Sequence, residues 1–262
     1  MSLGHRAAMD QTQKWPDRLW IVRHGESAGN VARDRAQRVR AHSIDYPTRD
    51  ADVPLSRLGE SQSDALGRWF AALPEAERPD VFLCSPYVRA RQTMERVLQQ
   101  CAVERDRVVY DERLREREFG IFDGLTRLGV EHQYPEQARA LTLIGKFYHR
   151  PPGGESWCDV ILRLRSVVDT ITREYRGDRV LIVAHQVTVL CFRYLFEQMD
   201  EAQILEIDRQ KDVANCAITA YSFDPSCGHT GRLALERYNF VAPLIAAGEP
   251  VTTEPDVPAG PR

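Results

Sequence analysis

An arginine and a histidine stand next to each other at the point where a buried strand should end. The run 19–22, Leu-Trp-Ile-Val, is short, apolar and rich in β-branched and aromatic residues, which predicts a strand. Arg23 and His24 follow it, and Gly25 then allows a sharp turn. A histidine can attack as a nucleophile, and an arginine can bind a phosphate group through two parallel hydrogen bonds. At a solvent-accessible strand end, where open α/β sheets bind ligands, the pair is compatible with phosphoryl chemistry. A histidine at a strand end is more often a structural residue, so the functional interpretation depends on further segments.

Three further segments carry charged or titratable side chains close to the ends of predicted strands or in a loop. A predicted strand ends near Ser85 and turns into a helix that carries Arg89 close to its start. The loop 114–120 holds carboxylates among arginines, and another predicted strand ends at His185. If these ends share one edge of a sheet, two histidines, two arginines and a carboxylate gather there. Such a set suits phosphoryl transfer, in which catalysis is mainly positioning and stabilisation of charge.

The order of the predicted elements defines the fold class. Strands are predicted near 18–24, 81–84, 108–110, 180–184, 217–223 and 233–238, and helices near 56–73, 87–100, 155–175 and 187–199. Between the first strand and Pro54 the sequence predicts a long polar loop. The alternation favours a single-domain α/β three-layer sandwich, with a mostly parallel sheet and helices on both faces.

The 262 residues are expected to form one domain between two tails. Residues 1–15 are polar and are predicted to be a flexible N-terminal tail, and the domain is expected over 16–240. Within it, 120–152 is predicted to be a substrate-side insertion, irregular or helical. Prolines punctuate 241–262, so this C-terminal tail is expected to be largely irregular.

Composition narrows the classes of partner. A formal net charge of −3 gives no reason to expect a nucleic-acid partner, because such binding needs a concentrated basic surface. The strongest apolar run, 180–196, is too short and too polar to span a bilayer, so no membrane partner is expected. The six cysteines lack metal-ligand spacing, and 1–15 lacks the apolar centre of a signal peptide. These features predict a soluble, cytoplasmic protein.

A series of motifs, in order along the chain, resembles those of one family. They are Arg-His-Gly-Glu-Ser at 23–27, Asp-Val-Pro-Leu-Ser at 52–56 with Gly59, Ser-Pro-x-x-Arg-Ala-x-Gln-Thr at 85–93, Glu-x-x-Phe-Gly-x-x-x-Gly at 116–124, Pro-Gly-Gly-Glu-Ser at 152–156, and the second histidine, His185. On these motifs the chain is similar to the histidine phosphatase superfamily, which includes the cofactor-dependent phosphoglycerate mutases. The resemblance covers about residues 18–238, most of the chain, and implies a phosphoglycerate mutase-like fold.

The resemblance implies a role for each charged residue. His24 would take the phosphoryl group as a phosphohistidine, and Arg23, Arg89 and His185 would hold its oxygens. Glu116 would be the general acid and later the general base for water. For this chemistry His24 must be neutral at the attacking nitrogen, with the proton of its other nitrogen held by a backbone carbonyl. The remaining histidines have no paired spacing, so no metal site is expected, and no cofactor is expected either.

Three residues are predicted to bind substrate: Ser27, Asn30 and Gln186. Asn30 stands at the family position expected to contact the phosphate. The common pattern has glycine after the second histidine, whereas this chain has Gln186, as the bisphosphatase half of the bifunctional fructose-2,6-bisphosphate enzymes does. Its amide could lie over a phosphate or cap the following helix, and both alternatives stay open. Val187 stands where the phosphoglycerate mutases have asparagine, which weakens the case for mutase activity.

The choice of acid rests on register with the motif. Glu112, Glu116 and Glu118 all lie in the same stretch. Register favours Glu116, and Glu118 is interpreted as a solvated partner of a neighbouring arginine. Arg117 is expected to be a surface charge.

Three functions are considered. A metal-independent phosphatase of a small phosphorylated metabolite is preferred, a phosphoglycerate-type mutase is second, and a non-catalytic phospholigand-binding module is third. The loops 31–53 and 120–152 are expected to select the substrate, because variable loops over a fixed site usually do so. The sequence leaves a homodimer open.

Overall fold

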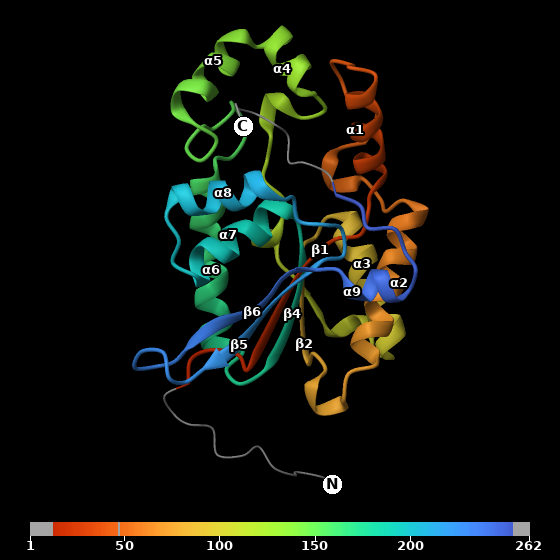
Figure 1. Ribbon diagram of the computed structural model, residues 1–262, viewed down its shortest axis with the longest axis vertical. Coiled ribbons are helices and arrows are strands. Elements are labelled where there is room, and N and C mark those ends of the chain that lie inside the picture. Colours follow the sequence, from red (N-terminus) through yellow and green to blue (C-terminus); the bar gives the residue numbers. More distant parts are fainter. Residues whose placement is uncertain (1–12, 47, 254–262) are drawn as a thin grey trace.

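Residues 13–46 and 48–253, which the computed structural model describes, form a six-stranded sheet flanked by helices (Figure 1). In chain order the elements are β1 (Arg18–Arg23), α1 (Ala28–Arg38), α2 (Arg57–Ala71), β2 (Val81–Cys84), α3 (Val88–Cys101), β3 (Val108–Tyr110), α4 (Arg127–Gln133), α5 (Pro135–Ile144), α6 (Trp157–Glu174), β4 (Arg179–Ala184), α7 (Gln186–Phe196), α8 (Glu201–Gln210), β5 (Ile218–Asp224), β6 (Arg232–Phe240) and α9 (Ala242–Ala246). Short 3-10 turns, including Asp50–Asp52 and Gly120–Phe122, lie in the connections.

The strands lie in the order β3-β2-β4-β1-β5-β6. The four strands from β3 to β1 are parallel, whereas β5 pairs antiparallel with both β1 and β6. The predicted mostly parallel sheet is therefore confirmed. Because Arg23 at the end of β1 lies opposite Ala184 at the end of β4, the next residues, His24 and His185, leave the sheet side by side.

Alternation of side chains along the central strands divides the core into two layers. Leu19 and Ile21 point to the face covered by α6, α7 and α8, and Trp20 and Val22 point to the face covered by α2, α3 and α9. All four of these side chains are buried. The apolar run that predicted a strand is therefore explained by burial on both faces of a parallel sheet.

Helix α1 lies where the sequence predicted a loop, so the prediction of a continuous loop to Pro54 is wrong. The helix is highly polar, and only Ala36 in it is buried, so it carries no apolar periodicity. A reciprocal capping box fixes its start: the Ser27 hydroxyl accepts from the backbone of Asn30, and the Asn30 side chain accepts from the backbone of Ser27. Helix α8 was also missed.

The two ends of the domain extend further than the sequence predicted. Residues 241–253 are not simply irregular, because α9 packs against α2 and buries Leu244 completely. The Gln62 side chain donates to the carbonyl oxygen of Pro250 over 2.9 Å. Trp15, predicted in the N-terminal tail, donates its indole N–H to Gly231 and packs edge-on against Phe196. The rest of the predicted tails, 1–12 and 254–262, lies outside the described residues.

The predicted insertion contains α4 and α5 with a small apolar cluster of its own. Phe119, Phe122, Leu125 and Val130 form this cluster, and the two helices lie at the top of Figure 1, beyond the carboxyl edge of the sheet. The segment 41–46 pairs with it, since the Thr126 amide donates to His42 and the Ile44 amide donates to Gly124. Two segments expected to select substrate therefore contact each other.

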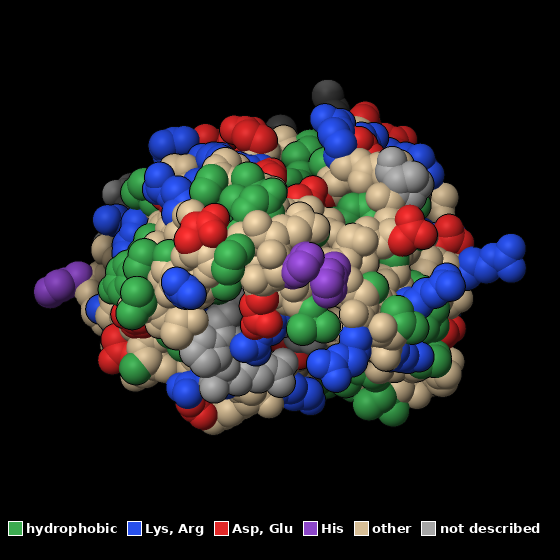
Figure 2. All heavy atoms as spheres, turned by 90° about the horizontal axis from the view of Figure 1, so that it is seen from above, with side chains coloured by type: hydrophobic (Ala, Val, Ile, Leu, Met, Phe, Trp, Pro, Cys, Tyr) green, Lys and Arg blue, Asp and Glu red, His purple; other side chains and the backbone are tan. Residues whose placement is uncertain are grey.

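Surface charge around these segments is mixed. Seen from above, positive and negative side chains are interspersed with apolar ones rather than gathered by sign (Figure 2). In the described part of the chain, no helix is both long enough and apolar enough to cross a membrane.

Candidate active site

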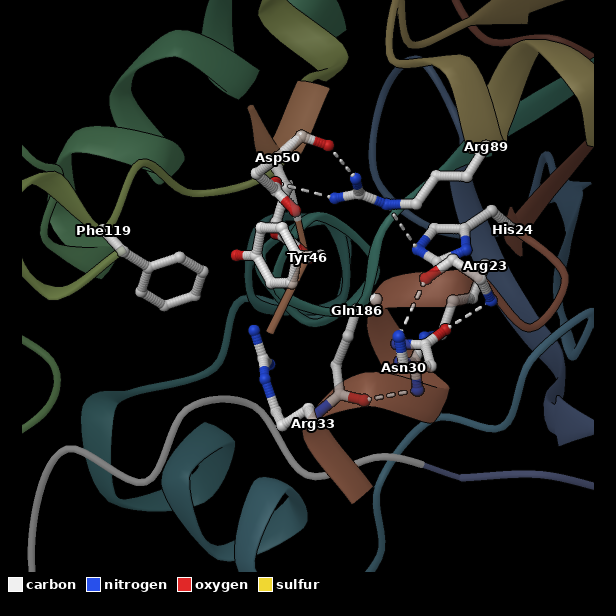
Figure 3. Close-up of a pocket in the computed structure, with 12 residues that line it drawn as sticks. Arg23, His24, Asn30, Arg33, Tyr46, Asp50, Arg89, Phe119 and Gln186 are labelled. Carbon is white, nitrogen blue, oxygen red and sulfur yellow. Dashed lines mark hydrogen bonds and ion pairs between the residues drawn. The ribbon is translucent and has the colours of Figure 1, made fainter. Parts of the chain in front are cut away.

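A cavity open to solvent lies over the carboxyl ends of β1 and β4 (Figure 3). It is lined by Arg23, His24, Ser27, Gly29, Asn30, Arg33, Tyr46, Asp50, Arg89, Glu116, Phe119 and Gln186. Of the eight predicted site residues, seven line this cavity. The eighth, His185, lies against His24, with their ring centroids 5.1 Å apart.

His24 is held in a single orientation by two hydrogen bonds. Its Nδ1 lies 2.7 Å from the Gly25 carbonyl oxygen, and because a carbonyl only accepts, Nδ1 carries the proton. Nε2 is therefore the unprotonated nitrogen, and it accepts from Nε of Arg89 over 3.2 Å. Burial, followed by the positive charges of Arg89 and Arg23, holds the pKa of His24 well below its usual value. The ring is thus neutral and has the tautomer that a nucleophile requires.

The exposure expected for His24 is wrong. The side chain is only 3% exposed, because the turn that follows it is packed against two helices. The Gly25 amide donates to Thr93 of α3, and the Glu26 amide donates to Gln62 of α2. The nucleophile therefore lies at the floor of the cavity rather than on an open edge.

His185 packs against His24 and does not itself line the cavity. It is completely buried at the start of α7, and its Nε2 lies 2.8 Å from the Ser85 hydroxyl. Its Nδ1 has no hydrogen-bond partner within the described ranges. Burial, followed by the charges of Arg89 and of His24, lowers its pKa strongly. A neutral imidazole with a spare nitrogen beside His24 can contact a phosphoryl oxygen.

The Gln186 side chain was expected either to lie over a phosphate or to cap the following helix. The N-cap residue of α7 is His185, and the hydrogen bonds of the Gln186 side chain go to other side chains rather than to the backbone at the start of the helix. Its Oε1 accepts from Nη1 of Arg23 over 2.9 Å, and its Nε2 donates to Asp212 over 3.2 Å. Arg23 also donates to the carbonyl oxygen of Val213. The Gln186 amide therefore orients Arg23, and its contact with substrate stays a prediction.

Ser27 and Asn30, two of the predicted substrate-binding residues, lie at the start of α1 and have different surroundings. The Ser27 hydroxyl is used by the helix cap, at 3.1 Å from the Asn30 amide. Asn30 accepts through Oδ1 from Ser27 and from Asn215. Both line the cavity, but Ser27 is explained by the helix start alone.

Among the three candidate acids, Glu116 alone lines the cavity. Its Oε1 accepts from the Arg117 amide over 2.9 Å. Glu118 points elsewhere, since its Oε1 accepts from the Tyr87 hydroxyl and its nearest arginine is Arg115 at 3.9 Å. The geometry agrees with the choice of Glu116 by register.

Arg117 was expected on the surface, and this is wrong. Its side chain is buried, with the guanidinium 4.8 Å from the centre of the Phe119 ring.

Sequence reasoning did not select Asp50. Its carboxylate and its carbonyl oxygen both accept from the guanidinium of Arg89. No local pattern marks Asp50, because the contact joins a 3-10 turn to a helix 39 residues further on. Arg33 and Tyr46, which also line the cavity, belong to the loop predicted to select substrate. In the described residues, no group of three or more His, Cys, Asp or Glu side chains is arranged to hold a metal ion.

Comparison with known proteins places the chain in a family. The model of the histidine phosphatase superfamily (branch 1) matches residues 19–235, and the chain belongs to this superfamily. Proteins similar to it include phosphatases and mutase-like proteins, which supports an enzymatic role.

Two relatives illustrate the range of proteins to which the chain is similar. A phosphoglycerate mutase-like protein of Arabidopsis thaliana, AT74H, is 27% identical over 241 residues, covering 85% of this chain and 79% of its own length. A 6-phosphofructo-2-kinase/fructose-2,6-bisphosphatase of Caenorhabditis elegans is 30% identical over 224 residues, covering 81% of this chain. The match spans only 43% of that bifunctional protein.

A solved structure shares the fold. A mycobacterial glucosyl-3-phosphoglycerate phosphatase in complex with inorganic phosphate superimposes with a TM-score of 0.66, covering 87% of this chain and 99% of that one. At 22% identity this similarity establishes the architecture and not the substrate.

Proposed function

We propose that this protein hydrolyses a small phosphomonoester through a phosphohistidine on His24. The observation that carries the proposal is the state of that ring. Nδ1–H is held by the Gly25 carbonyl, and Nε2 is left unprotonated toward Arg89 on the floor of the cavity. A neutral nitrogen beside a fixed guanidinium suits attack on a phosphate group.

The reaction divides into two transfers. Nε2 of His24 attacks phosphorus, the bond to the leaving oxygen breaks, and Glu116 gives its proton to that oxygen as the alcohol departs. Water then attacks the phosphohistidine, ionised Glu116 takes a proton from it, and inorganic phosphate leaves with His24 restored. Arg23, Arg89 and His185 bind the phosphoryl oxygens during both steps.

Hydrolysis is preferred to mutase activity because Val187 replaces the asparagine of the phosphoglycerate mutases. The mutase remains the second candidate, since AT74H carries a mutase-like name. The substrate is proposed to be a small phosphorylated metabolite, because the cavity is lined mainly by charged and polar side chains that suit a phosphate group. All six cysteines are free, which agrees with a reducing, cytoplasmic location.

The test combines a substrate screen with chemical trapping. We expect phosphate release from one or more phosphorylated metabolites with EDTA present, and no interconversion of phosphoglycerates in the presence of 2,3-bisphosphoglycerate. Rapid quenching should trap a phosphate group on His24, detected by mass spectrometry. Phosphoglycerate interconversion faster than hydrolysis would favour the mutase, and a trapped group on another residue would refute the mechanism.

A further inference from the structure

The guanidinium of Arg89 is held from two opposite sides. Its Nε donates to Nε2 of His24 over 3.2 Å. On its far edge Nη2 lies 2.9 Å from Oδ2 of Asp50, and Nη1 donates to the carbonyl oxygen of Asp50. Figure 3 shows Arg89 between the other two residues. Arg89 is 5% exposed, so the guanidinium is shielded from water, whereas the Asp50 side chain is 27% exposed.

A guanidinium has five N–H donors in one plane. Asp50 accepts from one hydrogen on each terminal nitrogen, and the Nε hydrogen points to the reacting nitrogen of His24. The plane also packs against the ring of Tyr87, 5.0 Å from its centre. A flexible side chain is therefore restricted to one orientation, in which Nε points to the reacting nitrogen of His24.

We infer that Asp50 is a positioning residue for phosphoryl transfer, which sets the direction of the Arg89 guanidinium toward His24. The inference rests on the proposed function, because it concerns the same phosphoryl site. Asp50 belongs to the segment that also carries Tyr46, whose hydroxyl donates to Asp123 over 3.0 Å. The turn of Asp50 thus joins the substrate-side segments to the arginine that acts on the phosphoryl group.

The carboxylate of Asp50 has two effects that can be separated. It orients Arg89, and orientation contributes most in the transition state. It also places a negative charge close to a site for anions, which weakens binding of free phosphate. Replacement by asparagine removes the charge and turns the bond to Nη2 of Arg89 into a weaker, neutral hydrogen bond, so the guanidinium is held less firmly. Loss of orientation should lower kcat, while loss of repulsion should leave phosphate binding as tight as before or tighter.

The test measures both quantities in Asp50→Asn. With p-nitrophenyl phosphate we expect kcat to fall about 10- to 100-fold, the range that misplacement of a catalytic group produces. The inhibition constant of inorganic phosphate should stay equal or decrease. The matched control is Asp52→Asn on the same turn, whose carboxylate pairs with the exposed Arg49 at 2.8 Å. It should leave both quantities within about twofold.

Three results would overturn the inference. One is an unchanged kcat in Asp50→Asn. A second is a phosphate inhibition constant that rises in parallel with the loss of kcat, which would indicate general damage to the pocket. A third is an equal loss in Asp52→Asn. Failure of the proposed function looks different, because the wild-type protein itself would then show neither hydrolysis nor a phosphohistidine.

Discussion

The two sides of the cavity are built in different ways. On the phosphoryl side, Arg23, His24 and His185 follow directly from neighbouring parallel strands and are at most 4% exposed. On the substrate side, Tyr46 and Asp50 come from a connecting segment without strands, and Phe119 precedes a short 3-10 turn. The first side is fixed by the sheet, whereas the second is fixed by contacts between connections.

The polar contacts show the same difference. The turn after β1 is tied to α2 and α3, and a side chain on Gly59 would overlap the carbonyl of Glu26, so helix and turn pack backbone to backbone. The substrate side depends on a few contacts such as Tyr46 to Asp123. Chemistry is therefore preorganised on rigid elements, and apart from Asp50, which holds Arg89, the segments that select the substrate can differ without disturbing it.

The largest expected effect is from His24→Ala. Loss of the nucleophile should lower kcat at least about 10³-fold on every substrate, because the oxyanion-type contacts alone cannot form the covalent intermediate. The free energy of unfolding should fall by only about 1–2 kcal/mol, since the ring makes two hydrogen bonds and borders a water-accessible cavity. Steady-state kinetics and denaturant unfolding measure the two quantities.

Residual turnover in His24→Ala above about one-thousandth of the wild-type rate would contradict the assignment of the nucleophile. It would also mean that the phosphoryl side of the cavity does not carry the essential catalytic group, contrary to the difference between the two sides described above.

Glu116→Gln is expected to have the next largest effect. Glutamine keeps the shape but cannot donate the proton to the leaving oxygen, so kcat should fall by about 10²–10⁴-fold on alkyl phosphates. The loss should be smaller with p-nitrophenyl phosphate, whose leaving group needs less protonation. It need not vanish, because hydrolysis of the phosphohistidine still requires a base.

The matched control is Glu118→Gln. Glu118 lies two residues away and contacts the Tyr87 hydroxyl outside the cavity, so it should change kcat less than about threefold. If Glu118→Gln proves more damaging than Glu116→Gln, the register of the motif is wrong and the acid must be reassigned.

The phosphoryl side could be predicted from sequence because its signals are local. A short apolar run predicts a strand, and the residue after it must then lie at the carboxyl edge of a parallel sheet. The positions of His24 and His185 follow from this rule, and Arg89 lies near them because it is in the first turn of α3, the helix that follows β2. What the rule omits is the depth of the site, so the burial of His24 and of Arg117 was not predicted.

The substrate side could not be predicted because its signals are not local. The helix α1 has little apolar periodicity, and its start depends on a capping box rather than on a buried face. The contact of Asp50 with Arg89 and that of Tyr46 with Asp123 join residues 39 and 77 positions apart. A single sequence carries no pattern that pairs such residues.

A pair of substitutions, one from each side, sharpens the comparison. Gln186→Leu removes the acceptor that holds Arg23 at 2.9 Å, so kcat/KM should fall about tenfold on all substrates alike.

Tyr46→Phe removes only the hydrogen bond to Asp123. It should therefore alter KM for the physiological class of substrate and leave KM for p-nitrophenyl phosphate within about twofold. A substrate-independent loss in Tyr46→Phe would show that the two sides are not separable.

The smallest expected effect is the dependence of stability on pH, which tests whether the phosphoryl side is buried in its neutral state. Burial lowers the pKa of both His24 and His185 in the folded protein, whereas in the unfolded chain a histidine has a pKa of about 6.5. Below that pH the unfolded state binds protons that the folded state does not, so the free energy of unfolding falls as pH falls. Each histidine should contribute a loss of roughly 1 kcal/mol between pH 6.5 and 5.5. Urea unfolding at both pH values measures this slope, and His24→Asn should reduce it by the share of one histidine. An equal slope in the variant would mean that His24 titrates alike in both states, so that its charge, and with it the preorganised side of the cavity, is open to water.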